Sequence, residues 1–186
     1  MRTKIKLTGS APNRSQMTST KQMQGNPPQV NSRDWWNNYF TESWDANGGS
    51  AQTRHFMQRL LDSLPPNELA WLNAKPRSIL DWGCAFGDGV KVVADRFPLG
   101  SVTGLDFAEV AIAQARERYP DHNFVLSPDG DIQGAYDCIF TSNCLEHFES
   151  PLAVVKTHLR SCNYLYVALV PFDEFPLHQG HHNRFR

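Results

Sequence analysis

Long apolar runs are absent from this chain of 186 residues, and its charges nearly cancel, with a formal net charge of −1. A membrane-spanning helix needs about 20 consecutive apolar residues, and no segment approaches that length. No apolar stretch follows the first basic residues, as it would in a secretory signal. Hydrophobic residues make up 40% of the chain and charged residues 20%, which is ordinary for a folded soluble domain. We therefore expect a cytoplasmic protein with no membrane partner.

Cysteines are few, and their spacing does not match a paired metal site. The four lie in or beside the expected core elements: Cys84, Cys138, Cys144 and Cys162. Thiols without paired spacing are typical of proteins in a reducing compartment. The sequence therefore predicts free cysteines.

Acidic residues are absent from residues 1–33, which carry six basic side chains, so the remainder of the chain has a net charge of −7. This stretch is rich in Ser, Thr, Gln and Asn, which predicts a disordered basic tail. Its composition leaves open an organelle-targeting leader or a weak contact with nucleic acid. The remainder shows no basic stripe, so nucleic acid is not the expected partner.

A short apolar strand that ends in a glycine-rich turn is the most informative segment. Residues 78–82 predict the strand, Gly83 and Gly87 lie in the turn, and residues 89–97 predict the helix that follows. Glycine permits positive φ and close approach of a ligand to the backbone. The start of a helix presents unpaired N–H groups. The segment is typical of a site for a nucleotide-like ligand.

The dinucleotide pattern G-x-G-x-x-G is not complete here, because Asp88 occupies the position of the third glycine. A carboxylate that faces a pyrophosphate would repel it. Asp106 ends the next expected strand, 19 residues after Gly87, where an acid can accept hydrogen bonds from both ribose hydroxyls. Together with Asp81 before the turn, this pattern favours a ligand that carries a ribose and positive charge, such as S-adenosylmethionine. A nicotinamide-dependent oxidoreductase is the less favoured alternative.

The segment from Asp81 to Gly87 resembles the first motif, acid-x-Gly-x-Gly-x-Gly, of the class I S-adenosylmethionine-dependent methyltransferases, with Ala85 at the middle glycine. Residues 137–140 and 145–151 are similar to two further motifs of the branch that contains quinone-biosynthesis and other small-molecule enzymes. The resemblance covers roughly residues 50–172. It implies a Rossmann-like fold and transfer of a methyl group to an oxygen or nitrogen of a small-molecule acceptor, with S-adenosylhomocysteine as the product.

By this resemblance we expect eight residues to bind the cofactor: Asp81, Gly83, Ala85, Gly87, Asp106, Phe107, Asp129 and Asn143. Asp81 would face the amino-acid end, Asp106 the ribose and Phe107 the adenine ring. Asp106 could instead cap the helix that follows it. Asp129 would lie near the adenine amino group, although Asp131 is close and the segment could be a plain Asp-Gly turn. Asn143 would lie near the methionine portion.

His147 is the expected catalytic residue, because a hydroxyl acceptor must lose a proton and imidazole titrates near neutral pH. A purely structural role is the alternative. Some members of the resembled group bind a divalent metal through a Glu-x-x-Glu-His pattern, but Asn143 stands in place of the first acid. We therefore predict no metal site, although four residues could collect an ion: Glu146, His147, His181 and His182.

Strands and helices alternate from residue 78, which predicts a doubly wound, mainly parallel sheet with helices on both faces. Three regions are expected: the tail over 1–33, an N-terminal helical cap over 34–77, and the cofactor-binding core over 78–186. Apolar spacing predicts a cap helix over 50–64. Trp36, Tyr39 and Gln52 would contact the cofactor from this cap, or the aromatic rings would simply pack over a sheet edge.

The remaining expected elements are strands over 102–106, 123–126, 136–141 and 164–170, and helices over 108–119 and 151–159. The last strand is apolar throughout, which is typical of a strand covered on both faces. The resembled fold usually adds two more strands, and these are lacking here. We therefore expect a truncated chain, or self-association through the exposed edge of the fifth strand. An inactive cofactor-binding module of a larger enzyme is the alternative function.

Overall fold

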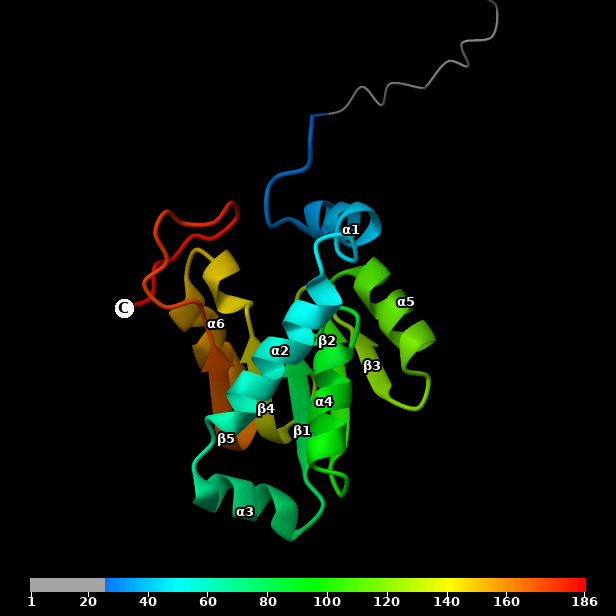
Figure 1. The fold of residues 1–186 in the computed structure, drawn as a ribbon, viewed down its shortest axis with the longest axis vertical. Helices are drawn as coiled ribbons and strands as arrows, with labels where there is room; N and C mark the ends of the chain where they lie inside the picture. Colours follow the sequence, from blue (N-terminus) through cyan, green and yellow to red (C-terminus); the bar gives the residue numbers. More distant parts are fainter. Residues whose placement is uncertain (1–25) are drawn as a thin grey trace, which may run out of the picture.

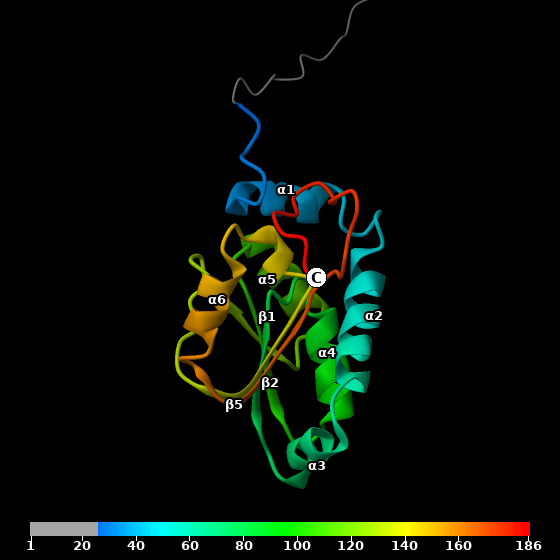
Figure 2. The ribbon, with the colours of Figure 1, turned by 90° about the vertical axis from the view of Figure 1, so that its left-hand side faces the viewer.

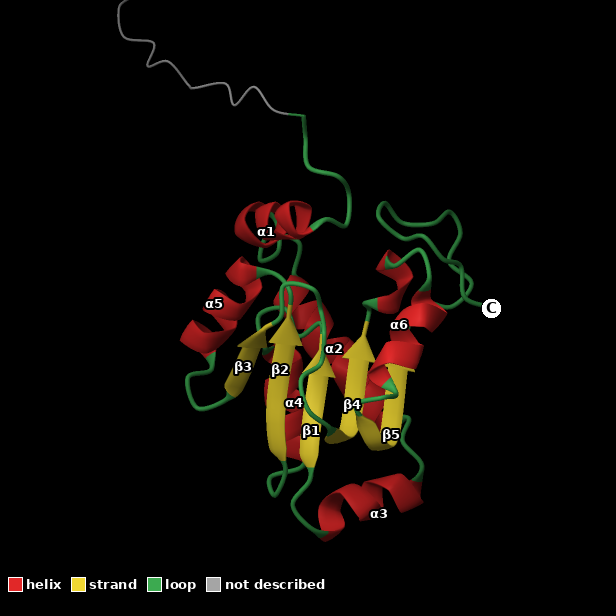
Figure 3. Cartoon of the chain, turned by 180° about the vertical axis from the view of Figure 1, so that it is seen from behind, coloured by secondary structure: helices red, strands yellow, loops and turns green. Residues whose placement is uncertain are grey.

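An open sheet with two buried faces forms the centre of the computed structural model, which describes residues 26–186. The strands are β1 (Ser78–Trp82), β2 (Ser101–Asp106), β3 (Asn123–Leu126), β4 (Tyr136–Ser142) and β5 (Cys162–Leu169). All neighbouring strands are parallel, in the order β3-β2-β1-β4-β5 (Figure 3). This arrangement confirms the Rossmann-like α/β fold.

The helices lie on both faces and at both ends of the sheet (Figure 1). They are α1 (Arg33–Glu42), α2 (Gly49–Asp62), α3 (Pro66–Ala74), α4 (Asp88–Arg96), α5 (Glu109–Arg118), the 3₁₀ turn η1 (Leu145–His147) and α6 (Pro151–His158). Each helix and strand expected from the apolar pattern is present, and its bounds differ from the expectation by two residues or fewer. None of the described helices has the length and apolar character needed to cross a membrane.

Successive residues of β1 point to opposite faces of the sheet, as the strand period requires. Ile79 packs into a cluster that contains Leu60 of α2 together with residues of α4 and α5. Leu80 packs into a second cluster, against which Val154 of α6 lies. Figure 2 shows α2 and α4 on one side of the sheet and α6 on the other. The chain therefore buries β1 on both faces.

The sequence analysis did not predict helix α3. The helix expected over 50–64 stops at the proline pair Pro65-Pro66, and no helix was expected directly after it. Proline at the first helical position lacks an N–H group that would have no helical partner there. Pro66 therefore both follows α2 and begins α3. The helix lies near the amino ends of the strands, away from the site described below (Figure 1).

The expected cover of β5 on both faces is present but partial, with Leu165 and Val167 packed against one core cluster and Tyr166 against the other. Within the described part of the chain β5 is an edge strand, paired only with β4, and none of its residues is fully buried. Tyr164 keeps 54% of its surface exposed and stacks on Trp71 of α3, with the ring centroids 4.0 Å apart. An apolar run alone does not distinguish an edge strand from an interior one, because the neighbours of a strand are set by topology.

Two segments far apart in sequence meet above the carboxyl ends of the strands. Asn31, just before α1, donates from Nδ2 to the carbonyl oxygen of Gly180 at 2.7 Å. The same side chain donates to the carbonyl oxygen of His147 at 3.1 Å. Figure 2 shows α1 and the segment after β5 over this end of the sheet. Residues 1–25 of the predicted basic tail over 1–33 lie outside the described residues.

Truncation of Leu60 tests the docking of α2 on the sheet. Leu60 has no exposed surface, so Leu60→Ala leaves a cavity and should lower the free energy of unfolding by about 2–5 kcal/mol in a denaturant titration. Leu152→Ala is the matched control, because Leu152 is 74% exposed on α6, and it should change stability by less than about 0.5 kcal/mol. Equal effects of the two substitutions would contradict the packing described here.

Candidate active site

A cavity of about 730 Å³ opens at the carboxyl ends of β1, β2 and β4. The chain runs from β1 outward to β3 and then returns to the other side of β1 with β4. The crevice at such a reversal of strand order is where open α/β sheets bind ligands, because the loops on either side diverge there. Helices α1 and α2 and the segment after β5 complete the walls of the cavity.

Asp81 lines the cavity with a buried carboxylate. It is 2% exposed, and its Oδ2 atom has no hydrogen-bond partner. Burial, followed by the nearby charge of Asp106, raises the pKa of Asp81 to about 7. Gly89 leaves room for this carboxylate, since a Cβ atom at residue 89 would lie 2.5 Å from Oδ2. A cation in the cavity would pair with this oxygen.

Asp106 connects the turn after β1 to the start of α5. Its Oδ2 accepts from the backbone N–H of Ala85 at 3.0 Å, and its Oδ1 accepts from Ala108 at 3.0 Å. Burial raises its pKa to about 6, against the opposing effect of these hydrogen bonds. Asp106 is not the N-cap of α5, contrary to the alternative considered, because Ala108 is the cap residue and no side chain caps the helix. Asp106 lines the cavity, and carboxylate oxygens retain lone pairs for a ligand.

The residues of the glycine-rich turn do not all lie at the cavity. Gly83 and Ala85 line the cavity, and both have positive φ, 77° and 46°. Ala85 thus adopts a conformation that glycine adopts more easily, which explains why the motif usually has glycine there. Gly87 does not line the cavity, contrary to expectation, and a Cβ atom there would lie 2.6 Å from Phe124. It permits a positive φ and close packing rather than a ligand contact.

Asp88 also lies outside the cavity lining, so the argument that it would repel a pyrophosphate is wrong. Its carboxylate accepts from Arg54 of α2 and, at 2.8 Å, from the hydroxyl of Tyr119. The helix turns this side chain toward α2 and away from the ligand region. The case against a dinucleotide therefore depends on the unpartnered Asp81 and not on Asp88.

The loop after β3 forms the wall beside Asp106. Phe107, Asp129 and Gly130 line the cavity, whereas Asp131 does not. The loop is a turn in which Gly130 N–H donates to the carbonyl of Ser127 at 2.8 Å. Trp82 at the end of β1 donates from Nε1 to the carbonyl of Gly130 at 2.9 Å. This bond holds the loop against the sheet.

Aromatic side chains of α1 cover the cavity. Trp36 and Tyr39 line it, with ring centroids 5.7 Å apart, and Gln52 of α2 lines it as well. Trp36 also meets the ring of His147 edge to face, with centroids 4.9 Å apart. The two roles considered for these aromatics coexist, because the rings pack on one another and also present a surface to the cavity.

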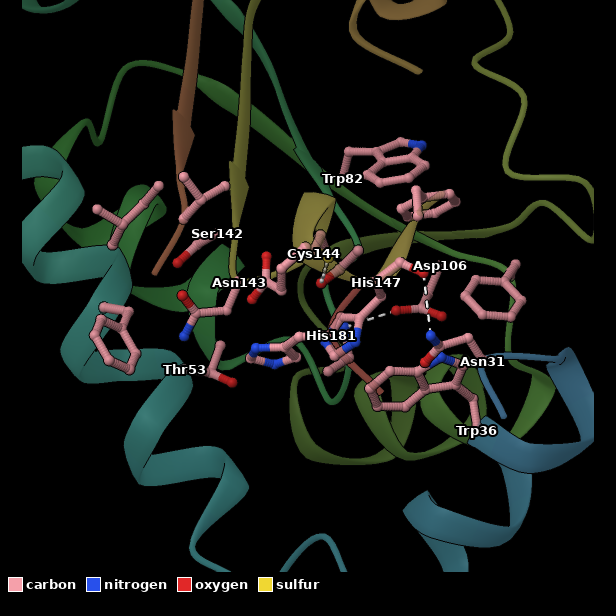
Figure 4. A pocket seen from close by; sticks show the side chains of 18 of the residues that line it. Asn31, Trp36, Thr53, Trp82, Asp106, Ser142, Asn143, Cys144, His147 and His181 are labelled. Atoms are coloured by element: carbon pink, nitrogen blue, oxygen red, sulfur yellow. Dashed lines mark hydrogen bonds between the residues drawn. The ribbon is translucent and has the colours of Figure 1, made fainter. Parts of the chain in front are cut away.

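The far end of the cavity is formed by η1 and by the segment after β5. Asn143 lines it with a positive φ of 51°, and its N–H donates to the carbonyl of Leu169 at 2.9 Å. His147 also lines it, and its Nδ1 atom lies 3.2 Å from the carbonyl oxygen of Gly180. Figure 4 shows Asn143, Cys144, His147 and His181 around this end.

His147 does not have the near-neutral titration expected of it, because burial lowers its pKa to about 4. The adjacent Glu146 is 1% exposed, and burial raises its pKa to about 7. The sequence identifies this pair of residues but not how deeply each is buried. His181, considered above only as a possible ion ligand, lines the cavity, and so do three residues that sequence reasoning did not name: Glu174, His178 and Gln179. The only signal for them is the local density of histidine.

Charge in the cavity has one sign. Five carboxyl side chains line it: Asp81, Asp106, Asp129, Glu146 and Glu174. No lysine or arginine of the described residues is part of the lining. Such a wall lowers the energy of a cation and raises that of a phosphate or a polycarboxylate.

Comparison with known proteins shows a family whose model matches more than half of the chain. The family model described as a methyltransferase domain matches residues 52–177. A trans-aconitate 2-methyltransferase of Rhodopseudomonas palustris is 42% identical over 55 residues, which are 30% of this chain and 21% of that protein. One of Escherichia coli is 30% identical over 126 residues, 58% of this chain and 48% of that protein. The chain thus spans less than half the length of the curated relatives that it matches.

Solved structures share the fold at low identity. The plantazolicin methyltransferase BpumL in complex with SAH has a TM-score of 0.52 and 21% identity, over 74% of this chain and 58% of that one. DesVI of Streptomyces venezuelae has a TM-score of 0.56 and 15% identity, over 75% and 61% of the two chains. These similarities show a shared fold over about three quarters of the chain.

Asp81→Asn should stabilise the ligand-free protein at alkaline pH. A carboxyl group whose pKa rises from 3.8 to about 7 on folding holds its proton more tightly in the folded chain, so stability falls as pH rises through that window. The gain at pH 8 is up to about 4 kcal/mol by the size of the shift, and it should shrink toward zero near pH 4.

Thermal unfolding of both proteins between pH 4 and pH 8 measures this difference. Asp95→Asn is the control, since Asp95 is an exposed partner of Lys91 and its substitution should give no such trend. A difference between Asp81→Asn and the unsubstituted protein that does not change with pH would show that Asp81 is not a strained buried charge.

Proposed function

Because this chain belongs to the methyltransferase domain family, we propose that it transfers a methyl group from S-adenosylmethionine to an oxygen or nitrogen of a small-molecule acceptor. The observation that carries this proposal is the unpartnered, buried Oδ2 of Asp81 in a cavity lined by acids. S-adenosylmethionine carries an ammonium, a sulfonium and a ribose, and it has no phosphate. Its charge complements that of the cavity.

The described residues fit the two ends of this cofactor. Asp81, with the backbone at Gly83 and Ala85 beside it, receives the ammonium of the amino-acid end. Asp106 lies one strand away, at the end of β2, and accepts from the ribose hydroxyls. Its carboxylate is already held by two backbone N–H groups, so it needs no reorganisation to do so.

The adenine ring would lie between Phe107 and the loop that contains Asp129. Trp82 fixes this loop through the carbonyl of Gly130, so the distance from the loop to Asp106 is set by the sheet. Asn143 closes the other side at the end of β4. This assignment leaves the region between α1, η1 and the segment after β5 for the acceptor.

The reaction needs little covalent chemistry from the protein. The cofactor supplies an electrophilic methyl carbon, and displacement there destroys a positive charge. The protein's part is to align the acceptor and to exclude water. Trp36 and Tyr39 of α1 cover the cavity, and the contacts of Asn31 with Gly180 and His147 join this cover to the opposite wall.

The acceptor that we propose is neutral or cationic. The curated relatives are named for trans-aconitate, which is a tricarboxylate, but the described residues offer no lysine or arginine to the cavity. A polycarboxylate would meet five carboxyl side chains there. Aromatic rings from α1 suit an acceptor with an apolar face instead.

The alternative is a cofactor-binding module that transfers no methyl group by itself. Both functions require that the cavity binds S-adenosylmethionine or its product and not a dinucleotide. Calorimetric titration with S-adenosylhomocysteine and with NAD tests this premise, and only S-adenosylhomocysteine should bind. Mass spectrometry of a metabolite mixture incubated with S-adenosylmethionine then separates the two functions. A new methylated product supports the enzyme, whereas tight cofactor binding with no product supports the module.

Asp106→Asn tests whether the ribose of the cofactor binds to the carboxylate of Asp106. Loss of a charged acceptor should weaken binding of S-adenosylhomocysteine by about 10- to 100-fold, as expected for hydrogen bonds to a charged group. Asp95→Asn, which removes a carboxylate far from the cavity lining, should leave the affinity unchanged. Unaltered affinity in Asp106→Asn, measured by calorimetry on folded protein, would contradict this placement of the cofactor.

A further inference from the structure

We propose that Glu146, His147 and His181 bind a divalent transition-metal ion, with zinc as the reference ion, at the acceptor end of the cavity. One ligand atom from each of the three side chains lies within 4.8 Å of the other two. All three residues line the cavity. The sequence predicted no metal site, because Asn143 stands in place of an acid, although these three residues were among four that could collect an ion.

Glu146 supplies the first argument. Its side chain is 1% exposed, and its Oε2 atom has no hydrogen-bond partner. A buried carboxylate oxygen without a donor is unfavourable, and native structures rarely leave one without a reason. Neither Lys nor Arg lines this cavity among the described residues. A cation held by the neighbouring imidazoles would provide the missing partner.

The two histidines supply the second argument, because the Nδ1 atom of each already has an acceptor, as in metal-binding histidines. Nδ1 of His147 lies 3.2 Å from the carbonyl oxygen of Gly180, which can only accept. Nδ1 of His181 lies 2.6 Å from Oε2 of Glu174. Both bonds place the proton on Nδ1 and leave the lone pair on Nε2. Metal-binding histidines are fixed in this way by a carbonyl or a carboxylate on their other nitrogen.

Hydrogen bonds fix η1 and the segment after β5 relative to each other, and these two segments carry the three side chains. Glu146 and His147 are adjacent in η1, and the N–H of His182 donates to the carbonyl of Glu146 at 2.8 Å. Asn31 bridges the carbonyls of His147 and Gly180. The rings of His147 and His181 meet edge to face with centroids 4.8 Å apart, and Figure 4 shows both beside Asn31. The ligand set is therefore assembled before any ion binds.

The donor set selects the kind of ion. Imidazole nitrogen favours zinc and other first-row transition ions, whereas Mg²⁺ and Ca²⁺ prefer oxygen. Two histidines and one glutamate form a ligand set of catalytic zinc sites, which keep one position open. On the proposed methyltransferase function, that position would hold an acceptor oxygen and favour release of its proton to solvent. The oxygen then bonds to the methyl carbon, and the sulfur leaves with the electron pair of the broken bond.

Cobalt titration tests the site without requiring activity. Tag-free protein, freed of metal by a chelator, is titrated with Co²⁺ and followed by its visible absorption, and Zn²⁺ is then added as a competitor. We expect one Co²⁺ per chain, displaced by Zn²⁺ and unaffected by Mg²⁺ or Ca²⁺. Glu146→Gln and His181→Ala should each abolish the visible band. Glu174→Gln should weaken binding about 10- to 100-fold, as is usual for a residue that orients a ligand.

His55→Ala is the matched control, because His55 is an exposed histidine on α2 that does not line the cavity, and it should bind Co²⁺ as the unsubstituted protein does. The absence of a visible band, or equal Co²⁺ affinity in Glu146→Gln and the control, would overturn the inference. Circular dichroism and thermal unfolding show that each variant is folded, and calorimetry with S-adenosylhomocysteine on the same proteins measures cofactor binding separately. Cofactor binding without Co²⁺ binding refutes only the metal site, and Co²⁺ binding without cofactor binding refutes only the proposed function.

Discussion

The carboxylate of Asp81 at the end of β1 is the constraint on which the rest of the site depends. It is buried, and its Oδ2 has no hydrogen-bond partner among the described protein groups, so a cation in the cavity can pair with it. The sheet supplies this group at low cost in conformational freedom, because β1 is paired on both sides. Gly89 keeps space for it, and Asp106 adds a second carboxylate one strand away. The buried charge of Asp81 thus lowers the stability of the ligand-free protein and raises its affinity for a cationic nucleoside.

A second constraint acts at the other end of the cavity. The segment after β5 has no helix or strand of the sheet, yet the N–H of His182 donates to the carbonyl of Glu146 in η1, and the side chain of Asn31, before α1, donates to the carbonyl of Gly180. It carries Glu174 and His181 to the site, whereas Asp81 and Asp106 stand at the carboxyl ends of strands. This division explains how a common sheet can keep one cofactor while the acceptor chemistry varies with less regular segments.

The sequence predicted the sheet and the cofactor end well, because those features follow from short-range pattern. Carboxyl ends of parallel strands meet at one edge, so Asp81 and Asp106 could be expected to lie together. The failures have a common cause in contacts between distant residues. Asp88 turns toward Arg54 and Gly87 toward Phe124, and both partners lie more than thirty positions away. The approach of Glu174 to the cavity depends on topology in the same way, and α3 was missed because one proline pair serves two helices. The edge position of β5 was expected, because no strand was predicted after it.

The most direct test of the account is a crystal structure of the protein with S-adenosylhomocysteine. The account predicts that the ammonium group of the ligand lies against Oδ2 of Asp81 and that the ribose hydroxyls donate to the carboxylate of Asp106. A ligand bound elsewhere, or one in this cavity whose ammonium does not meet Asp81, would contradict the central claim.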